Sequence, residues 1–218
     1  MLQRGAYPAP RAAALSGVPL STVHWWARND VLEPSISKER IKLWSYADLM
    51  GLRVIHWLRQ AKTSDDGAAI PRSAMPAVRQ AVSQLRELDM ELWSEETGPN
   101  VLVDRAGSIH LATAPEAEAA HRQRVLDQDA LNLIAPFNVG RARGPNLVTP
   151  RPLLRIVPGK LGGAPHIHRT RVESEALSAL RDGGLQTAVI YELYPDLPRD
   201  AIDEALDLET QLQGNLAA

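Results

Sequence analysis

Three cations near the amino end recur at alternate positions. Lys38, Arg40 and Lys42 are each separated by one residue, and Ile41 lies between the last two. Two residues is the period of a β-strand, so we expect the three cations to share one face of a ribbon over Ile36–Trp44. Cationic side chains on one face bind nucleic-acid phosphates, and such binding weakens as salt rises.

Polar side chains precede this basic segment on one face of an expected helix, Leu20–Arg28. Its other face carries Leu20, Val23, Trp26 and Ala27 at helical spacing and is expected to be buried. The polar face can contact base edges and phosphates, although His24 could equally be a solvent-exposed side chain. Trp25 is expected to pack on the ribbon, and stacking at the DNA backbone is the alternative. The candidate DNA-binding residues are Ser21, Thr22, His24, Arg28, Lys38, Arg40 and Lys42.

Charge is strongly segregated along the chain, although the net charge is only −2. Residues 1–62 have nine cations and four acids, a net charge of +5, and residues 141–171 have seven cations and no acid. Residues 173–210 have ten acids and two cations, a net charge of −8. The amino end therefore fits contact with phosphates, whereas the carboxyl end does not.

His166 and His168 are the residues that best fit a metal site, because alternate histidines share a strand face. No Asp or Glu occurs between residues 141 and 171 to complete it, so we expect structural histidines and neither metal nor cofactor. No nucleophile–base pair, phosphate-binding loop or catalytic carboxylate pair stands out, so the sequence predicts no enzyme.

The elements that must position the candidate residues begin with two short helices. Arg11–Leu15 and Leu20–Arg28 are separated by a turn in which Gly17 can adopt a positive φ and Pro19 opens the second helix. Ser45 is then the expected N-cap of a long apolar helix, Tyr46–Gln60. A further helix is expected over Pro71–Glu87.

The remaining segments are expected to be a hairpin, a helix, a linker and three helices. Strand patterns at Val101–Val103 and Ser108–Leu111 flank a turn, Asp104–Gly107, and a helix is expected over Pro115–Leu133. Pro136–Pro152 has the composition of an exposed linker. Helices are then expected at Ser174–Arg181, at Leu185–Tyr194 and from Pro198 or Arg199 onward.

Composition fits a protein of the cytoplasm. The 218 residues are 44% hydrophobic, which suffices for a core, and there is no cysteine for disulfides or thiolate zinc sites. No apolar run approaches the roughly 20 residues that span a bilayer, and the amino end lacks the apolar stretch of a secretory signal. We therefore expect no membrane association.

The first quarter of the chain resembles the MerR-type winged helix. The resemblance is carried by Ser16-Gly17-Val18, Ser21-Thr22, Trp26, Val31-Leu32, Pro34, Trp44-Ser45 and Asp48-Leu49. It implies a winged helix-turn-helix that binds DNA as a homodimer, with the helices beyond the wing supporting dimerisation or only packing on the winged helix. A small helical domain that contacts another protein is the alternative.

The last 60 or so residues resemble the small domain found in VapB-type antitoxins. The resemblance is carried by Gly163-Ala164-Pro165, Thr170-Arg171-Val172, Gly184-Leu185, Tyr194-Pro195-Asp196-Leu197 and Ala205-Leu206. The family pattern has glycine directly before Thr-Arg, whereas this chain has Arg169. The pattern implies a basic extended arm followed by three helices.

Together the resemblances imply an antitoxin that binds operator DNA and neutralises a VapC-type PIN-domain ribonuclease toxin. Such a nuclease clusters carboxylates around Mg²⁺, and the planar fork of arginine binds carboxylates at two points. The candidate toxin-binding residues are Arg141, Arg143, Arg169 and Arg171. These cations could instead be solvated or pair with the acidic helices of their own chain.

The expected fold is mainly α with a small β element. Residues 1–90 would form the winged helix with a helical extension, 91–152 the hairpin, helix and linker, and 153–218 the toxin-binding domain. A MerR-like transcriptional regulator with a ligand-sensing carboxyl-terminal half is the alternative function, and a self-contained interaction scaffold is a third.

Overall fold

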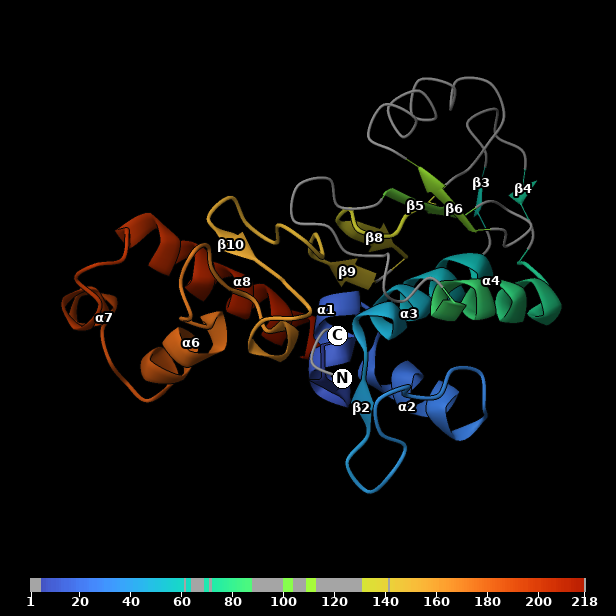
Figure 1. Cartoon of the computed structure of the whole chain (residues 1–218), viewed down its shortest axis with the longest axis horizontal. Coiled ribbons are helices and arrows are strands. Elements are labelled where there is room, and N and C mark those ends of the chain that lie inside the picture. The colour runs from blue at the N-terminus through green and yellow to red at the C-terminus, as the bar shows by residue number, and fades with distance from the viewer. Residues whose placement is uncertain are drawn as a thin grey trace.

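The computed structural model describes residues 5–60, 62–63, 69–70, 72–87, 100–103, 109–112, 131–140 and 142–217. This part of the chain is mainly helical with short antiparallel strand pairs, as the sequence predicts. The carboxyl-terminal helices lie at one end of the molecule, α3 and α4 lie at the other, and α1 lies between them (Figure 1).

The first two helices are α1, Ala9–Ser16, and α2, Leu20–Arg28. Gly17 ends α1 with φ of 78°, and its N–H donates to the Ala13 carbonyl. The buried side chains of α2 are Val23, Trp26 and Ala27, three of the four expected from the spacing, whereas Leu20 is only half-buried. This arrangement leaves the polar face of α2 in solvent.

The basic ribbon is much shorter than expected. Strand β1, Tyr7–Pro8, pairs with β2, Leu43–Trp44, and beyond them only Ser37 bridges to Leu43. Residues 38–42 form a loop instead of a strand, so the prediction that their cations share a strand face is wrong. The Ser37 hydroxyl donates to the Ile41 carbonyl over 2.9 Å, and such local bonds compete with a strand ladder.

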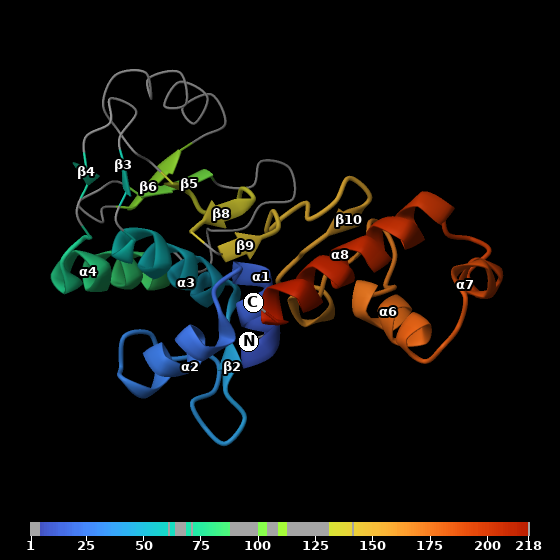
Figure 2. The same cartoon turned by 180° about the vertical axis from the view of Figure 1, so that it is seen from behind.

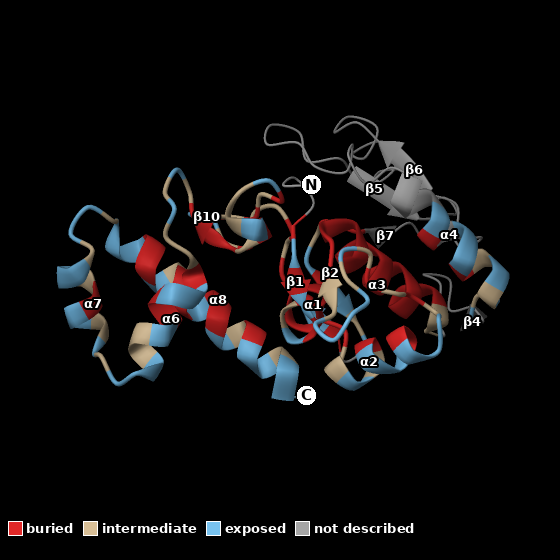
Figure 3. Cartoon of the chain, turned by 60° about the horizontal axis from the view of Figure 1, so that its bottom comes forward, coloured by how far each residue is buried: buried red, intermediate tan, exposed pale blue. Residues whose placement is uncertain are grey.

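Helix α3, Tyr46–Arg59, is the centre of the amino-terminal part and is buried from Tyr46 to Leu58 (Figure 3). The expected cap is present: the Ser45 hydroxyl accepts from the Asp48 N–H over 3.1 Å, and the Asp48 carboxylate accepts from the Ser45 N–H over 2.8 Å. The cap fixes where the buried helix begins.

Helix α4, Met75–Glu87, packs on α3 through Val78 and Val82 and starts four residues later than expected.

Two strand sets follow α3 in the chain. One is the pair β3, Lys62–Thr63, and β4, Ala69–Ile70; the other is a sheet of order β6-β5-β7, comprising β5, Asn100–Val103, β6, Ile109–Ala112, and β7, Leu131–Asn132.

The predicted β5–β6 hairpin is confirmed as antiparallel, with Val101 opposite Leu111. Its turn lies outside the described residues, as do residues 115–130 of the helix expected over Pro115–Leu133. The end of that segment is not helical, because β7 pairs with β5 there. Strand pairing within the sheet determines the conformation of this short apolar end.

The segment predicted to be an exposed linker is packed into the core. It forms β8, Phe137–Val139, and β9, Ala142–Gly144, and it buries Phe137, Ala142 and Leu147. Gly144 allows the segment to pack closely on α3, because a Cβ at this position would lie 2.5 Å from an Arg53 nitrogen. A Gly- and Pro-rich composition therefore reflects tight contacts here, and the linker prediction is wrong.

The three expected carboxyl-terminal helices are present as α6, Ser174–Asp182, α7, Thr187–Leu193, and α8, Arg199–Ala217. Before them, β10, Leu154–Arg155, pairs with β11, His166–Ile167, and a 3-10 turn, Leu161–Gly163, lies between these strands. Helix α8 runs from α7 back to α1, as both opposite views show (Figures 1 and 2).

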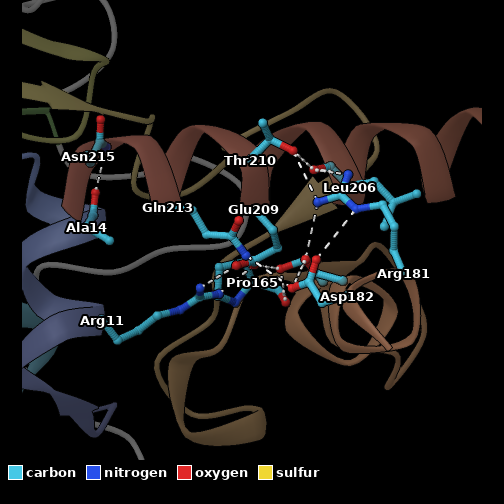
Figure 4. Close-up of polar contacts among 12 residues, drawn as sticks. Arg11, Ala14, Pro165, Arg181, Asp182, Leu206, Glu209, Thr210, Gln213 and Asn215 are labelled. Atoms are coloured by element: carbon cyan, nitrogen blue, oxygen red, sulfur yellow. Dashed lines mark hydrogen bonds and ion pairs between the residues drawn. The ribbon is translucent and has the colours of Figure 1, made fainter. Parts of the chain in front are cut away.

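A buried ion pair joins the two ends of the chain. The Arg11 guanidinium, on α1, donates to both carboxylate oxygens of Glu209, on α8, over 2.6 and 2.7 Å (Figure 4). Glu209 also accepts from the Ser174 hydroxyl, and the Asn215 amide donates to the Ala14 carbonyl. The expected first and third units are thus in direct contact.

Within the described residues, no helix combines the length and the apolar character required to cross a membrane.

Candidate functional site

An open groove of about 630 Å³ lies between α2 and the loop that precedes β2. We call residues 38–42 the wing loop. In Figure 1 both α2 and the wing loop project at the lower edge of the molecule. The groove is lined by Pro8, Ala9 and Pro10, by Ser21, His24 and Arg28 of α2, and by Arg40, Ile41 and Lys42 of the wing loop.

The groove brings together five of the seven candidate DNA-binding residues. Arg28 lies on the α2 side, with Ser21 and His24, whereas Arg40 and Lys42 lie on the wing-loop side. All five side chains are exposed except that of Lys42, which is partly exposed. Three cations around one open groove can hold a phosphate backbone, and the hydroxyl and imidazole groups can form directional hydrogen bonds.

The other two candidates do not line the groove. Thr22 is half-buried, and its backbone N–H donates to the Pro19 carbonyl over 2.9 Å. Lys38 forms an ion pair with Glu33. Because this partner neutralises Lys38, we expect it to contribute less to phosphate binding than Arg40 or Lys42.

Two cations that raise the charge of the amino-terminal segment have structural roles. Arg11 pairs with Glu209, and Arg53 is fully buried. The Arg53 guanidinium donates to five backbone carbonyls, those of Leu15, Ser16, Leu133, Ala135 and Pro145, over 2.6–3.3 Å. Burial lowers its pKa to about 9. The net charge of residues 1–62 therefore overstates the positive charge that is exposed on the surface of this segment.

Ile41 is the groove residue that sequence reasoning placed elsewhere. A strand would have turned it away from the cations, but the wing loop leaves it between them and 68% exposed. Trp25 on α2 is also half-exposed, at 52%, instead of packed on a ribbon. The sequence feature that could have placed Ile41 in the groove is its position between two cations, Arg40 and Lys42.

The four candidate toxin-binding arginines do not form one cluster. Arg141 lies outside the described residues. Arg143 is exposed on β9, where its guanidinium donates to the Gly140 and Ala142 carbonyls over 2.9 and 2.7 Å. Arg169 and Arg171 lie on a different hairpin, in the turn that follows β11. Among the three described arginines, Arg169 and Arg171 share one turn, whereas Arg143 lies on another hairpin.

The turn after β11 presents Arg169 and Arg171 to solvent. The Thr170 hydroxyl donates to the Ile167 carbonyl and accepts from the Val172 N–H, which holds the turn closed. Arg169 has a φ of 61°, a left-handed conformation that favours the glycine of the family pattern. Among the described residues, no carboxylate lies within ion-pair distance of Arg169 or Arg171.

Pairing between the basic segment and the acidic helices does occur, but at another residue. Arg151 contacts Asp207 over 2.8 Å and donates to the Gln211 side chain over 2.7 Å, both on α8. The Leu153 N–H also donates to Glu204. The alternative of intramolecular pairing therefore holds for Arg151, whereas Arg169 and Arg171 are solvated.

His166 is buried beside β10, and its Nδ1 lies 3.0 Å from the Ala164 carbonyl. Burial lowers its pKa, and the cations Lys160 and Arg155 lower it further. In the described part of the chain, no three His, Cys, Asp or Glu side chains are grouped to hold a metal ion.

Comparison with protein families gives one match. The model of a domain described as "Protein of unknown function (DUF433)" matches residues 155–207, which run from Arg155 at the end of β10 through β11, α6 and α7 to the first half of α8. No curated protein and no solved structure matches the chain. The matched region is the one that resembles the small antitoxin domain, and it contains Arg169 and Arg171.

Proposed function

We propose that this protein is an antitoxin that binds the operator DNA of its own operon and neutralises a PIN-domain ribonuclease toxin. The groove between α2 and the wing loop is the observation that carries the DNA-binding part. Arg28, Arg40 and Lys42 surround it from two elements, and the exposed polar groups of α2 lie beside them. A helix with exposed polar groups enters a major groove, while flanking cations contact phosphates.

Electrophoretic mobility shifts with the DNA upstream of the gene test this part. The double variant Arg40→Ala/Lys42→Ala should weaken binding to all sequences and reduce the slope of log affinity against log salt by about 2. Arg28→Ala should also relax sequence preference, because its side chain lies on the helix face. Lys38→Ala is the matched control: Lys38 is in the same loop but pairs with Glu33, so its effect should be small.

Absence of binding to this DNA, or an affinity independent of salt, would refute the DNA-binding part. If Lys38→Ala weakened binding as much as Arg40→Ala/Lys42→Ala, the phosphate contact would lie outside the groove, because Lys38 does not line it.

The turn after β11 supports the toxin-binding part. Arg169 and Arg171 are exposed, adjacent in space along one turn, and among the described residues have no carboxylate partner, so their forks are available to an acidic protein site. The domain match over residues 155–207 includes them, and domains of this kind often occur in toxin–antitoxin-like contexts. The acidic helices beside the turn disfavour nucleic acid as its ligand.

Arg169→Gly separates binding from folding. Glycine relieves the left-handed φ of 61°, so this variant should be more stable than the parent by about 1 kcal/mol. Combined with Arg171→Ala, it should restore ribonuclease activity to a complex with a PIN-domain nuclease encoded beside this gene. Arg151→Ala is the control, because it disrupts an internal pair with Asp207 and should lower stability without releasing the nuclease.

Full inhibition by the Arg169→Gly/Arg171→Ala variant would remove the turn from the proposed interface. If no nuclease gene adjoins this one, the antitoxin proposal fails while the DNA-binding part remains.

A ligand-sensing regulator is the second candidate, supported by a cavity of about 370 Å³ between α1, α6 and α8. Glu175, Asp182 and Arg11 line it together with apolar residues. A small molecule there would touch both ends of the chain. A DNA affinity that changes with a metabolite extract, in the absence of any nuclease partner, would favour this alternative.

A further inference from the structure

Ile41 has a position that DNA phosphate binding alone does not explain. It is more exposed than any other large apolar side chain in the described part of the chain, at 68%. Single exposed apolar residues are common, so exposure by itself indicates nothing. Ile41, however, lies directly between Arg40 and Lys42, and all three line the groove beside α2.

The wing loop is an ordered turn that holds Ile41 outward. The Ile36 and Ser37 N–H groups donate to the Leu43 carbonyl over 3.2 Å, and the Leu43 N–H donates back to Ser37 over 3.0 Å. The Ser37 hydroxyl then bonds to the Ile41 carbonyl itself. Because the loop is closed at its base and at Ile41, the side chain projects from a fixed backbone.

The sizes of the two elements assign them to different grooves of DNA. A helix with its side chains is about 10–12 Å across and fits the major groove, which is about 12 Å wide. The minor groove is only about 6 Å wide and admits single side chains from a loop tip. The strand of sugar and phosphate between the two DNA grooves would then lie between Arg28 on one side and Arg40 and Lys42 on the other.

We propose that Ile41 is an apolar wedge that enters the minor groove beside the major groove contacted by α2. This inference rests on the proposed DNA binding. It adds that the protein selects DNA with an easily deformed base step at a set distance from the α2 contact. A side chain inserted between base pairs partly unstacks them and bends the duplex, and flexible steps bend at lower cost.

Affinity and bending of the DNA upstream of the gene test the wedge. The bend is measured as energy transfer between dyes on the two DNA ends. Ile41→Ala should lower affinity about tenfold, because the apolar surface buried in the minor groove is lost, and should reduce the bend. Ile36→Ala is the matched control: the same residue type lies at the base of the same loop, outside the groove, and should change affinity by less than about twofold.

Inosine-substituted DNA identifies the groove. Inosine in place of guanine keeps the O6 and N7 acceptors of the major groove but lacks the amino group in the minor groove. The parent protein should bind this DNA more tightly than normal DNA, and Ile41→Ala should lose that gain. Contacts from α2 in the major groove would be unaffected.

Each outcome decides the matter. If Ile41→Ala bends the DNA and prefers inosine as the parent protein does, the wedge is overturned and the proposed DNA binding stays intact. A loss of affinity with an unchanged bend would have the same meaning. If the folded parent protein does not bind the upstream DNA at all, the proposed DNA binding fails as well. Because Ile41 is exposed, its replacement by alanine should leave the protein folded, and circular dichroism checks this.

Discussion

Arg53 shows how one residue type can mislead when only its charge is counted. It adds a positive charge to a segment expected to bind DNA, yet it is buried and bonded to five carbonyls. Two of these, on Leu15 and Ser16, belong to the last turn of α1, where the helix dipole favours a cation. Its ring contact is Phe137, whose centroid lies 5.4 Å away. One guanidinium thereby joins α1, α3 and the segment 133–145.

Arg53→Met should therefore destabilise the protein by roughly 3 kcal/mol or more, because several buried carbonyls lose their donor. Arg59→Met, in the same helix, removes, among the described residues, a single 3.4 Å bond to the Ser73 carbonyl and should cost less than about 1 kcal/mol. Urea unfolding of both variants provides the comparison. Equal losses would mean that the carbonyls around Arg53 find other partners.

His56 should make stability depend on pH. It lies between the rings of Trp26 and Phe137, with Nε2 3.3 Å from the Val139 carbonyl. Burial lowers its pKa from 6.5. The unfolded state then binds more protons, so stability is fully present above about pH 6.5 and falls as pH drops from there to the folded-state pKa.

Thermal unfolding between pH 7.5 and 5 should show this fall in the parent and a shallower one in His56→Gln, which keeps a donor for Val139 but does not titrate. Part of the slope should persist, because burial also lowers the pKa of His166. A slope identical in the two proteins would assign the dependence to other groups.

At the scale of elements, the close approach of α1 and β9 depends on a pair of glycines. Gly17 has a positive φ, and a Cβ on it would lie 2.4 Å from the Gly144 nitrogen. Gly162 also has a positive φ, of 62°, but a Cβ there would meet nothing within 4 Å. A substitution at Gly17 or at Gly162 would therefore strain the backbone in the same way, but only the substitution at Gly17 would also produce a steric clash.

Gly162→Ala should cost about 1 kcal/mol from the left-handed backbone alone, and Gly17→Ala should cost several times more because β9 must move. Denaturant midpoints of the two variants measure the difference. If both lose the same stability, the contact between the α1 turn and β9 is looser than the structure has it.

For the whole molecule, the Arg11–Glu209 pair joins the two ends of the chain. Both side chains are largely buried. Although burial alone lowers the pKa of Arg11, its hydrogen bond and attraction to Glu209 raise it overall. Removing either partner leaves a buried charge without its counterion, which typically costs about 3–5 kcal/mol.

Arg11→Met and Glu209→Leu should each destabilise the protein by about that amount, and the double variant should cost much less than their sum. Calorimetry measures the three variants, and it also shows whether the two ends still unfold in one transition. Additive losses would mean that the two side chains act independently, contrary to the bidentate contact.

The sequence by itself determined the elements whose signals are local. Helical spacing, the Ser45 cap and the proline and glycine boundaries predicted α1, α2, α3 and the three carboxyl-terminal helices, because caps and turn residues act within a few positions of themselves. The exposed face of α2 followed from the same periodicity.

Only the tertiary structure decided how distant segments meet. The alternation at Lys38–Lys42 predicted a strand, but a strand requires a partner, and the one available, β1, pairs only with Leu43 and Trp44. The composition of Pro136–Pro152 indicated a linker, yet Gly144 fits against Gly17 and Arg53, and Phe137 lies against Arg53. Partners so far apart in the chain leave no periodic signal, so the groove, the buried arginine and the link between the chain ends arise from packing alone.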